Sequence, residues 1–116
     1  MLMNEVYETI NEIYESRDVI SIKSLKNMLE ACTEIRNINY SMFSAGDQKG
    51  RPVYRIQFYE IDYDQEMYLW FYFYDENNIA IQQLFGMKNS KFDVNYRNNR
   101  SPKFDFNPIE INRQYL

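Results

Sequence analysis

The chain contains no histidine and only one cysteine, Cys32. The lack of histidine excludes Ser-His-Asp and Cys-His nucleophile systems and nearly every zinc site, because all of these use an imidazole. A single cysteine cannot form an internal disulfide, which fits a reducing compartment. No Gly-x-Gly-x-x-Gly occurs, and Gly46 and Gly50 lack the Gly-Lys-Ser/Thr of a phosphate-binding loop. These absences predict a protein that is not an enzyme and that holds no cofactor.

The sequence also lacks long apolar runs and a linker-like composition. No stretch approaches the roughly 18 apolar residues of a membrane span, and the N-terminal residues lack a basic start followed by an apolar run. We therefore expect a cytoplasmic protein. Glycine and proline number only three each among 116 residues, which favours a single folded domain over residues 1–116. Within it we expect a helical pair over residues 1–36, an antiparallel sheet over residues 38–107 and a C-terminal tail over residues 108–116.

Aromatic residues are abundant instead, at 17% of the chain, and many gather in residues 67–74. Successive side chains of a strand point to opposite faces of its sheet, so this segment has two unlike sides. One side is purely apolar and belongs in a core: Met67, Leu69, Phe71 and Phe73. The other side, which we call the tyrosine row, carries a ring with a polar tip at every position: Tyr68, Trp70, Tyr72 and Tyr74. Such rings suit a surface that is wet when free and dry when bound.

Hydrophobic spacing indicates two helices followed by a sheet. Apolar residues recur three and four positions apart over residues 2–16 and 21–36, which predicts a helix in each segment. From residue 38 onward apolar and polar residues alternate between short turn segments. The predicted strands cover residues 38–42, 53–61, 67–74, 79–87 and 91–97, with a short edge strand at Phe104 and Phe106. This order predicts an α+β fold, with the two N-terminal helices packed on one face of a five- or six-stranded antiparallel meander sheet.

Carboxylates are concentrated on both sides of the tyrosine row along the chain: Glu60, Asp62, Asp64, Glu66, Asp75 and Glu76. On an extended segment the first four would share one side, where they could hold Mg²⁺ or Ca²⁺ or dock a basic partner. The plain alternative is a solvated strand-to-turn segment whose like charges discourage edge pairing. With a formal net charge of −4, the chain favours a basic protein partner over direct binding to DNA or RNA.

These features predict a non-catalytic, acidic binding protein that inhibits or neutralises a larger protein partner. An immunity protein, an antitoxin or a phage-type inhibitor of a nucleic-acid enzyme fits this description, because carboxylates can occupy the phosphate subsites of a basic nuclease. The expected binding residues are Tyr59, the tyrosine row and the six carboxylates.

Three other arrangements of the tyrosine row stay open at the level of sequence. A strongly curved sheet would enclose the row in a small-ligand or enzymatic cavity, with Arg55 or Gln57 as polar contacts. The row could also join two copies of the chain in a homodimer. Finally, the C-terminal segment, with Phe104, Phe106 and Ile109, could fold over the row and cover it.

A single-stranded nucleic-acid-binding module is a further alternative, carried by the C-terminal region. Basic charge interleaved with aromatic rings is how single strands are held. The strip consists of Lys91, Tyr96, Arg97, Arg100, Lys103, Phe104, Phe106 and Arg113.

Overall fold

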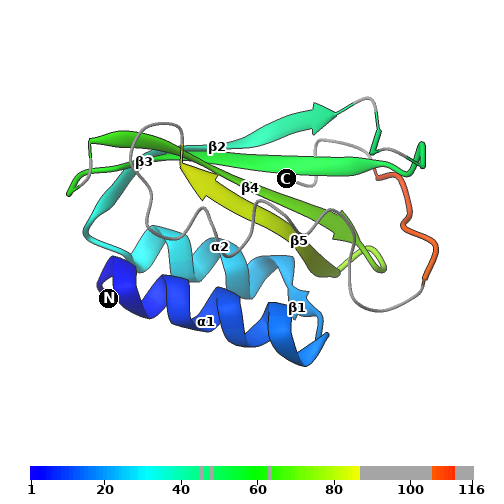
Figure 1. The fold of residues 1–116 in the computed structure, drawn as a ribbon, viewed down its shortest axis with the longest axis horizontal. Helices are drawn as coiled ribbons and strands as arrows, with labels where there is room; N and C mark the ends of the chain where they lie inside the picture. Colours follow the sequence, from blue (N-terminus) through cyan, green and yellow to red (C-terminus); the bar gives the residue numbers. More distant parts are fainter. Residues whose placement is uncertain (45, 48, 63, 87–105, 112–116) are drawn as a thin grey trace.

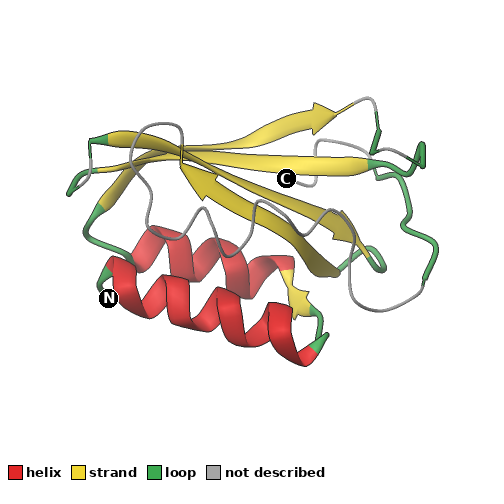
Figure 2. Ribbon diagram, in the orientation of Figure 1, coloured by secondary structure: helices red, strands yellow, loops and turns green. Residues whose placement is uncertain are grey.

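The computed structural model describes residues 1–44, 46–47, 49–62, 64–86 and 106–111, and for residues 41–44 and 85 it describes the backbone. Two helices and five strands follow one another in the order α1, β1, α2, β2, β3, β4, β5, which makes an α+β fold (Figure 1). Both helices lie along the same side of the sheet (Figure 2). The strand expected at residues 91–97 and the edge residue Phe104 lie outside the described residues.

Helix α1 spans Met3–Ser16 and presents one apolar stripe. At its start, the Glu5 carboxylate accepts a hydrogen bond from the backbone N–H of Leu2 at 3.1 Å. At its end, Arg17 adopts a left-handed conformation with φ 62° and turns the chain away. The buried residues recur at helical spacing, so that they face the sheet together: Met3, Val6, Tyr7, Ile10 and Tyr14.

Helix α2 spans Ile22–Ala31 and is shorter than the hydrophobic spacing predicts. Its N-cap is Ser21, whose hydroxyl accepts a hydrogen bond from the backbone N–H of Ser24 at 3.0 Å. The helix expected to reach residue 36 ends early, because the backbone is already extended at Cys32, with φ −79° and ψ 119°. Strand β2 begins at Ile35, so this residue and Arg36 belong to the sheet.

The sheet contains β1 (Ile20–Ser21), β2 (Ile35–Ser44), β3 (Val53–Glu60), β4 (Gln65–Phe73) and β5 (Asn78–Gly86). Its strand order is β1-β5-β4-β3-β2, and every neighbouring pair is antiparallel. Strands β2 to β5 form an antiparallel meander, which accounts for four of the five or six strands that the sequence predicts. The two-residue strand β1 is not predicted by the sequence, and it pairs Ile20 with Ile79 at the β5 edge.

The main core lies between the helices and one face of the sheet. The apolar side of residues 67–74 is fully buried there, as the alternation predicts. It packs with Ile56 and Phe58 of β3 and with the apolar stripes of both helices. Within the described part of the chain, neither helix combines the length and the apolar composition that crossing a membrane requires.

Part of the expected C-terminal tail is attached to the sheet. The backbone N–H of Ile109 donates to the carbonyl oxygen of Phe73 at 3.0 Å and forms an isolated bridge there. Two residues further, the N–H of Ile111 donates to the hydroxyl of Tyr54 at 2.9 Å. Residues 106–111 thus lie at the C-terminal end of β4, beside the last positions of the tyrosine row.

Candidate functional site

The candidate site is the sheet face that points away from the main core. On β3 the positions between the buried Tyr54, Ile56 and Phe58 are partly exposed, and β4 shows the same alternation up to Trp70. Cross-strand pairing brings the partly exposed positions side by side, and β2 contributes Arg36 opposite Tyr59. We call this set the arginine–aromatic face: Arg36, Arg55, Gln57, Tyr59, Glu66, Tyr68 and Trp70.

Arg55 occupies the middle of the arginine–aromatic face, against two rings. Its guanidinium carbon lies 4.6 Å from the ring centroid of Tyr68 and 5.2 Å from that of Trp70. The cross-strand pair Arg55 and Trp70 and the neighbouring pair Gln57 and Tyr68 set this geometry. A cation over an aromatic ring is stabilised by about 0.5–2 kcal/mol, depending on its exposure to water. The rings therefore favour this position of the guanidinium.

A second arginine is held in the same way at the β2 end of the face. The guanidinium carbon of Arg36 lies 4.9 Å from the ring centroid of Tyr59. The Tyr59 hydroxyl in turn donates a hydrogen bond to the carboxylate of Asp64. Between the two arginines, Gln57 donates to Glu66 at 3.3 Å, so that the polar groups of the face are linked across β3 and β4.

Tyr72, a predicted member of the binding surface, is fully buried. Its hydroxyl donates to Asp47 at 2.6 Å and accepts from the amide of Gln82 at 2.9 Å. The guanidinium of Arg51 covers its ring at 5.0 Å. The expectation that Tyr72 is available to a partner is therefore wrong, because the loop between β2 and β3 packs over it.

Asp47 organises that loop. Besides the Tyr72 hydroxyl, its carboxylate accepts hydrogen bonds from the backbone N–H groups of Lys49 and Arg51 and from Nε of Arg51, each at 2.8–2.9 Å. Burial raises the pKa of Asp47, but the hydrogen bonds from Tyr72, Arg51 and Lys49 outweigh burial and lower it to about 2. Burial and the neighbouring Asp47 carboxylate raise the pKa of Tyr72. The cluster is consequently a neutral phenol beside a carboxylate that stays ionised.

The last member of the tyrosine row meets the C-terminal segment. Tyr74 is 49% exposed, and its ring lies 5.4 Å from that of Phe106, centroid to centroid. Phe106 also contacts the ring of Tyr72 edge-on, at 6.4 Å. Phe106 therefore covers part of Tyr72 and Tyr74, as expected if C-terminal residues fold over the tyrosine row.

The carboxylates expected to share one side of an extended segment are separated. Glu60 is fully buried on the helix side, where it accepts a hydrogen bond from the Tyr7 hydroxyl. Glu66 lies on the arginine–aromatic face, opposite Tyr59 in the ladder. Glu60 is therefore a buried structural residue and not part of a docking surface, because strand alternation places it with Ile56 and Phe58.

The other four carboxylates lie in the turns at the two ends of β4. Asp62 and Asp64 are exposed in the turn before it, and a hydrogen bond shared with Glu34 raises the pKa of Asp62. Asp75 and Glu76 lie in the turn after it, where the backbone N–H of Asn77 and the side chain of Asn78 lower the pKa of Asp75. Within the described residues, no group of three or more cysteine and acidic side chains is arranged to hold a metal ion.

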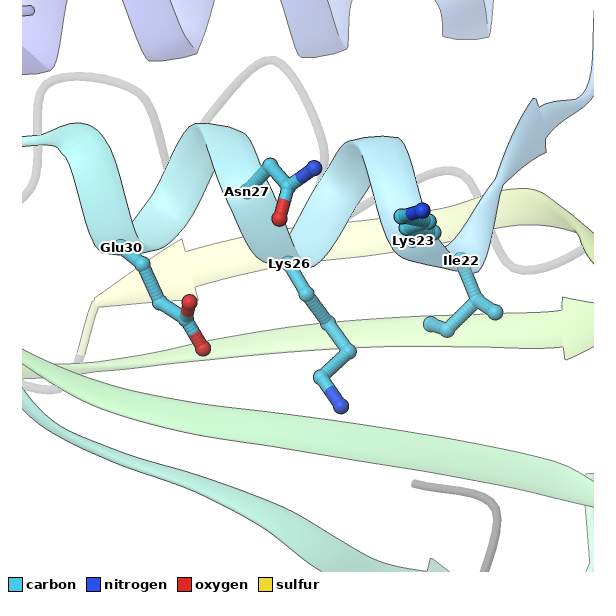
Figure 3. A pocket seen from close by; sticks show the side chains of 5 residues that line it. All are labelled: Ile22, Lys23, Lys26, Asn27 and Glu30. Atoms are coloured by element: carbon cyan, nitrogen blue, oxygen red, sulfur yellow. The ribbon is translucent and has the colours of Figure 1, made fainter.

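A shallow hollow of about 290 Å³ lies beside α2. Its lining residues come from that helix, and none belongs to the tyrosine row: Ile22, Lys23, Lys26, Asn27 and Glu30 (Figure 3). Internal contacts occupy two of its charged groups, since Lys26 lies 4.7 Å from the ring centroid of Tyr40, and the Tyr40 hydroxyl donates to Glu30 at 2.8 Å. The hollow is thus separate from the arginine–aromatic face. It is also not the aromatic cavity of the alternative hypothesis, which the tyrosine row would line.

Comparison of the chain with known proteins assigns no function to it, so the proposed function depends on the geometry of the site. No family model, no curated protein and no solved structure matches it.

The rings of the site are expected from the sequence, but the contacts of its arginines are not. Arg55 is expected on the correct side of its strand, but its position against Tyr68 and Trp70 depends on strand register. Arg36 is assigned to a helix, because Cys32 and Ile35 fit a helical stripe as well as a strand entry. The signal that places Arg55 beside the tyrosine row is the alternation of Arg55, Gln57 and Tyr59 with buried residues.

Proposed function

We propose that the protein is a non-catalytic binding protein that uses its arginine–aromatic face to inhibit a larger protein partner. The single observation that carries the proposal is the position of Arg55 against Tyr68 and Trp70, on the sheet face away from the helices. Tyrosine, tryptophan and arginine are the residues that most often dominate the binding energy of protein interfaces. The type of inhibitor that we propose is an immunity protein, an antitoxin or a phage-type inhibitor of a nucleic-acid enzyme.

Preorganisation of the side chains supports this proposal. A free arginine side chain loses about 2 kcal/mol of rotamer entropy when it is fixed. Arg55 is already positioned by two rings, and Arg36 by one, so that much of this loss precedes binding. Strands hold these side chains more rigidly than a loop would.

The distribution of charge supports a partner surface that carries both basic and acidic groups. Carboxylates lie in the turns at both ends of β4, while the arginines lie between them. Asp62, Asp64 and Glu76 are exposed there. In our proposal they meet basic groups of the partner at the rim, where charges set the rate of association and the choice of partner. We place the protein in the cytoplasm, since its one cysteine, Cys32, is buried and unpaired.

Affinity capture from the native host tests the proposal. The wild type is compared with Trp70→Ala and Tyr68→Ala, and with Asn11→Ala as a matched control on the exposed side of α1. We expect both ring variants to lose the captured partner and the control to retain it. Circular dichroism and thermal melting confirm that each variant is folded.

Direct binding assays separate this proposal from nucleic-acid binding. The purified protein is titrated with a panel of basic nucleases and with DNA. We expect the purified protein to bind a nuclease of the panel in preference to DNA. Tight DNA binding that weakens steeply with salt, together with no loss of captured protein in the ring variants, overturns the proposal.

A further inference from the structure

We infer that the partner places a carboxylate against the guanidinium of Arg55, and a second carboxylate against that of Arg36. This inference rests on the proposed function of the arginine–aromatic face and specifies the chemistry of the partner. The occupant is an acidic, extended segment of a protein.

The two arginines hold positive charges that the described part of the chain does not match. Arg51, on the same side of the sheet, donates from Nε to the Asp47 carboxylate at 2.8 Å. Arg36 and Arg55 have no carboxylate within ion-pair distance among the described residues. Among the residues that the structure describes, the buried Nε atom of Arg55 also has no hydrogen-bond acceptor. Contact with a ring stabilises the charge and satisfies none of the N–H donors in the plane of the group.

A carboxylate is the group that completes this arrangement. The guanidinium presents N–H donors in a rigid, planar fork that matches the two oxygens of a carboxylate. The contact of Cζ with the two rings uses none of these N–H donors. Lysine, a point charge, would not offer the same geometry.

A protein carboxylate fits better than the phosphates of a single-stranded nucleic acid. Single strands are held mainly by bases that stack on aromatic rings. Here the rings of Tyr59, Tyr68 and Trp70 are already engaged by guanidinium groups. The chain as a whole also carries a formal net charge of −4, which disfavours a polyanion with charge at every nucleotide.

Strand geometry gives the spacing of the two carboxylates. Arg36 lies opposite Tyr59, and Tyr59 lies four residues after Arg55 on the same face of β3, with Gln57 between them. Four residues of a strand span roughly 13 Å. An extended partner segment reaches both arginines with carboxylates about four residues apart, which point to the same side of the segment.

The experiment titrates the protein with a synthetic peptide of high β-propensity that carries two glutamates at this spacing. A second peptide replaces both glutamates with glutamine. Binding is followed by calorimetry and by the emission of Trp70, the only tryptophan in the chain. We expect the acidic peptide to bind at least tenfold more tightly than the glutamine peptide. Arg55→Lys and Arg36→Lys each weaken the acidic peptide, while Lys23→Gln on α2 leaves its affinity unchanged.

Three outcomes overturn the inference. The first is equal binding of the two peptides, and the second is no binding of the acidic peptide up to millimolar concentration. The third is binding of a thymidine oligonucleotide, in preference to the acidic peptide, that Arg55→Lys abolishes. If Arg55→Lys and Arg36→Lys retain a host partner that Trp70→Ala loses, the carboxylate inference fails and the proposed function stands. If Trp70→Ala and Tyr68→Ala retain that partner too, the proposed function fails.

Discussion

The hydroxyl of Tyr72 donates a hydrogen bond to the carboxylate of Asp47, with 2.6 Å between the two oxygens. This contact joins the loop between β2 and β3 to β4. The side chain of Gln82 on β5 donates to the same hydroxyl at 2.9 Å, next to a register shift between β4 and β5. Three parts of the chain are thus fixed by one phenol. The residue that looks like a partner contact in the sequence is a structural residue in the fold.

Tyr72→Phe removes this hydroxyl and leaves the ring in place. We expect the free energy of unfolding to fall by about 1–3 kcal/mol, because the buried Asp47 and Gln82 side chains each lose a hydrogen-bond partner. Urea denaturation measures the change. Tyr74→Phe is the matched control, since Tyr74 is half-exposed, and its stability should stay within about 0.5 kcal/mol of the wild type. Equal effects of the two substitutions would contradict the structural role of Tyr72.

The low pKa of Asp47 predicts a loss of stability in acid. Its folded pKa is about 2, below the ordinary value of 3.8. The carboxylate therefore contributes stability that is fully present above about pH 4 and is lost as the pH falls toward 2. The contribution amounts to about 2 kcal/mol. Urea denaturation of the wild type and of Asp47→Asn should show a difference near neutral pH that shrinks in acid. A difference that is independent of pH would contradict this assignment.

The middle of the sheet follows closely from the sequence, because β3 alternates and β4 alternates up to Trp70. The apolar sides of β3 and β4 lie in the core, as period-two patterning predicts. The same patterning places Glu60 on the core side with Ile56 and Phe58. The grouping of Glu60 with Asp62, Asp64 and Glu66 assumes that the extended strand continues through the turn, where Asp64 has φ 49°.

Other features depend on contacts between distant parts of the chain. The burial of Tyr72 requires Asp47 and Gln82, and no local pattern links these residues. The end of α2 is ambiguous in sequence because the spacing of Leu29, Cys32 and Ile35 continues a helical stripe. The contacts of Arg55 follow from strand register, which turn geometry and packing determine together.

Gly86→Ala tests a close approach between β5 and β4. A Cβ atom at this position would lie 2.5 Å from Oε1 of Gln65, whose side chain is buried. We expect a loss of stability of about 1–3 kcal/mol from this overlap. The loss should be smaller in a Gln65→Ala background, which a double-mutant cycle measures. An equal loss in both backgrounds would show that the overlap with Gln65 is not the cause.

Tyr7→Phe tests the buried contact between α1 and β3. The Tyr7 hydroxyl donates to the carboxylate of Glu60, and both residues lie in the core. Removal of the donor leaves a buried carboxylate less well solvated, and we expect the free energy of unfolding to fall by about 1–3 kcal/mol. Thermal and urea denaturation measure the loss. An unchanged stability would show that other groups solvate Glu60 sufficiently.

Trp70 offers the most direct test of the arginine–aromatic face as a binding surface. It is the only tryptophan, it lies on this face beside Arg55, and it is partly exposed. Acrylamide quenching of its fluorescence is measured for the free protein and for the complex with the captured partner. We predict that acrylamide quenches Trp70 in the free protein, and that the complex protects it and shifts its emission to shorter wavelength. Equal quenching and unchanged emission in the complex would contradict the proposal that the partner binds to this face.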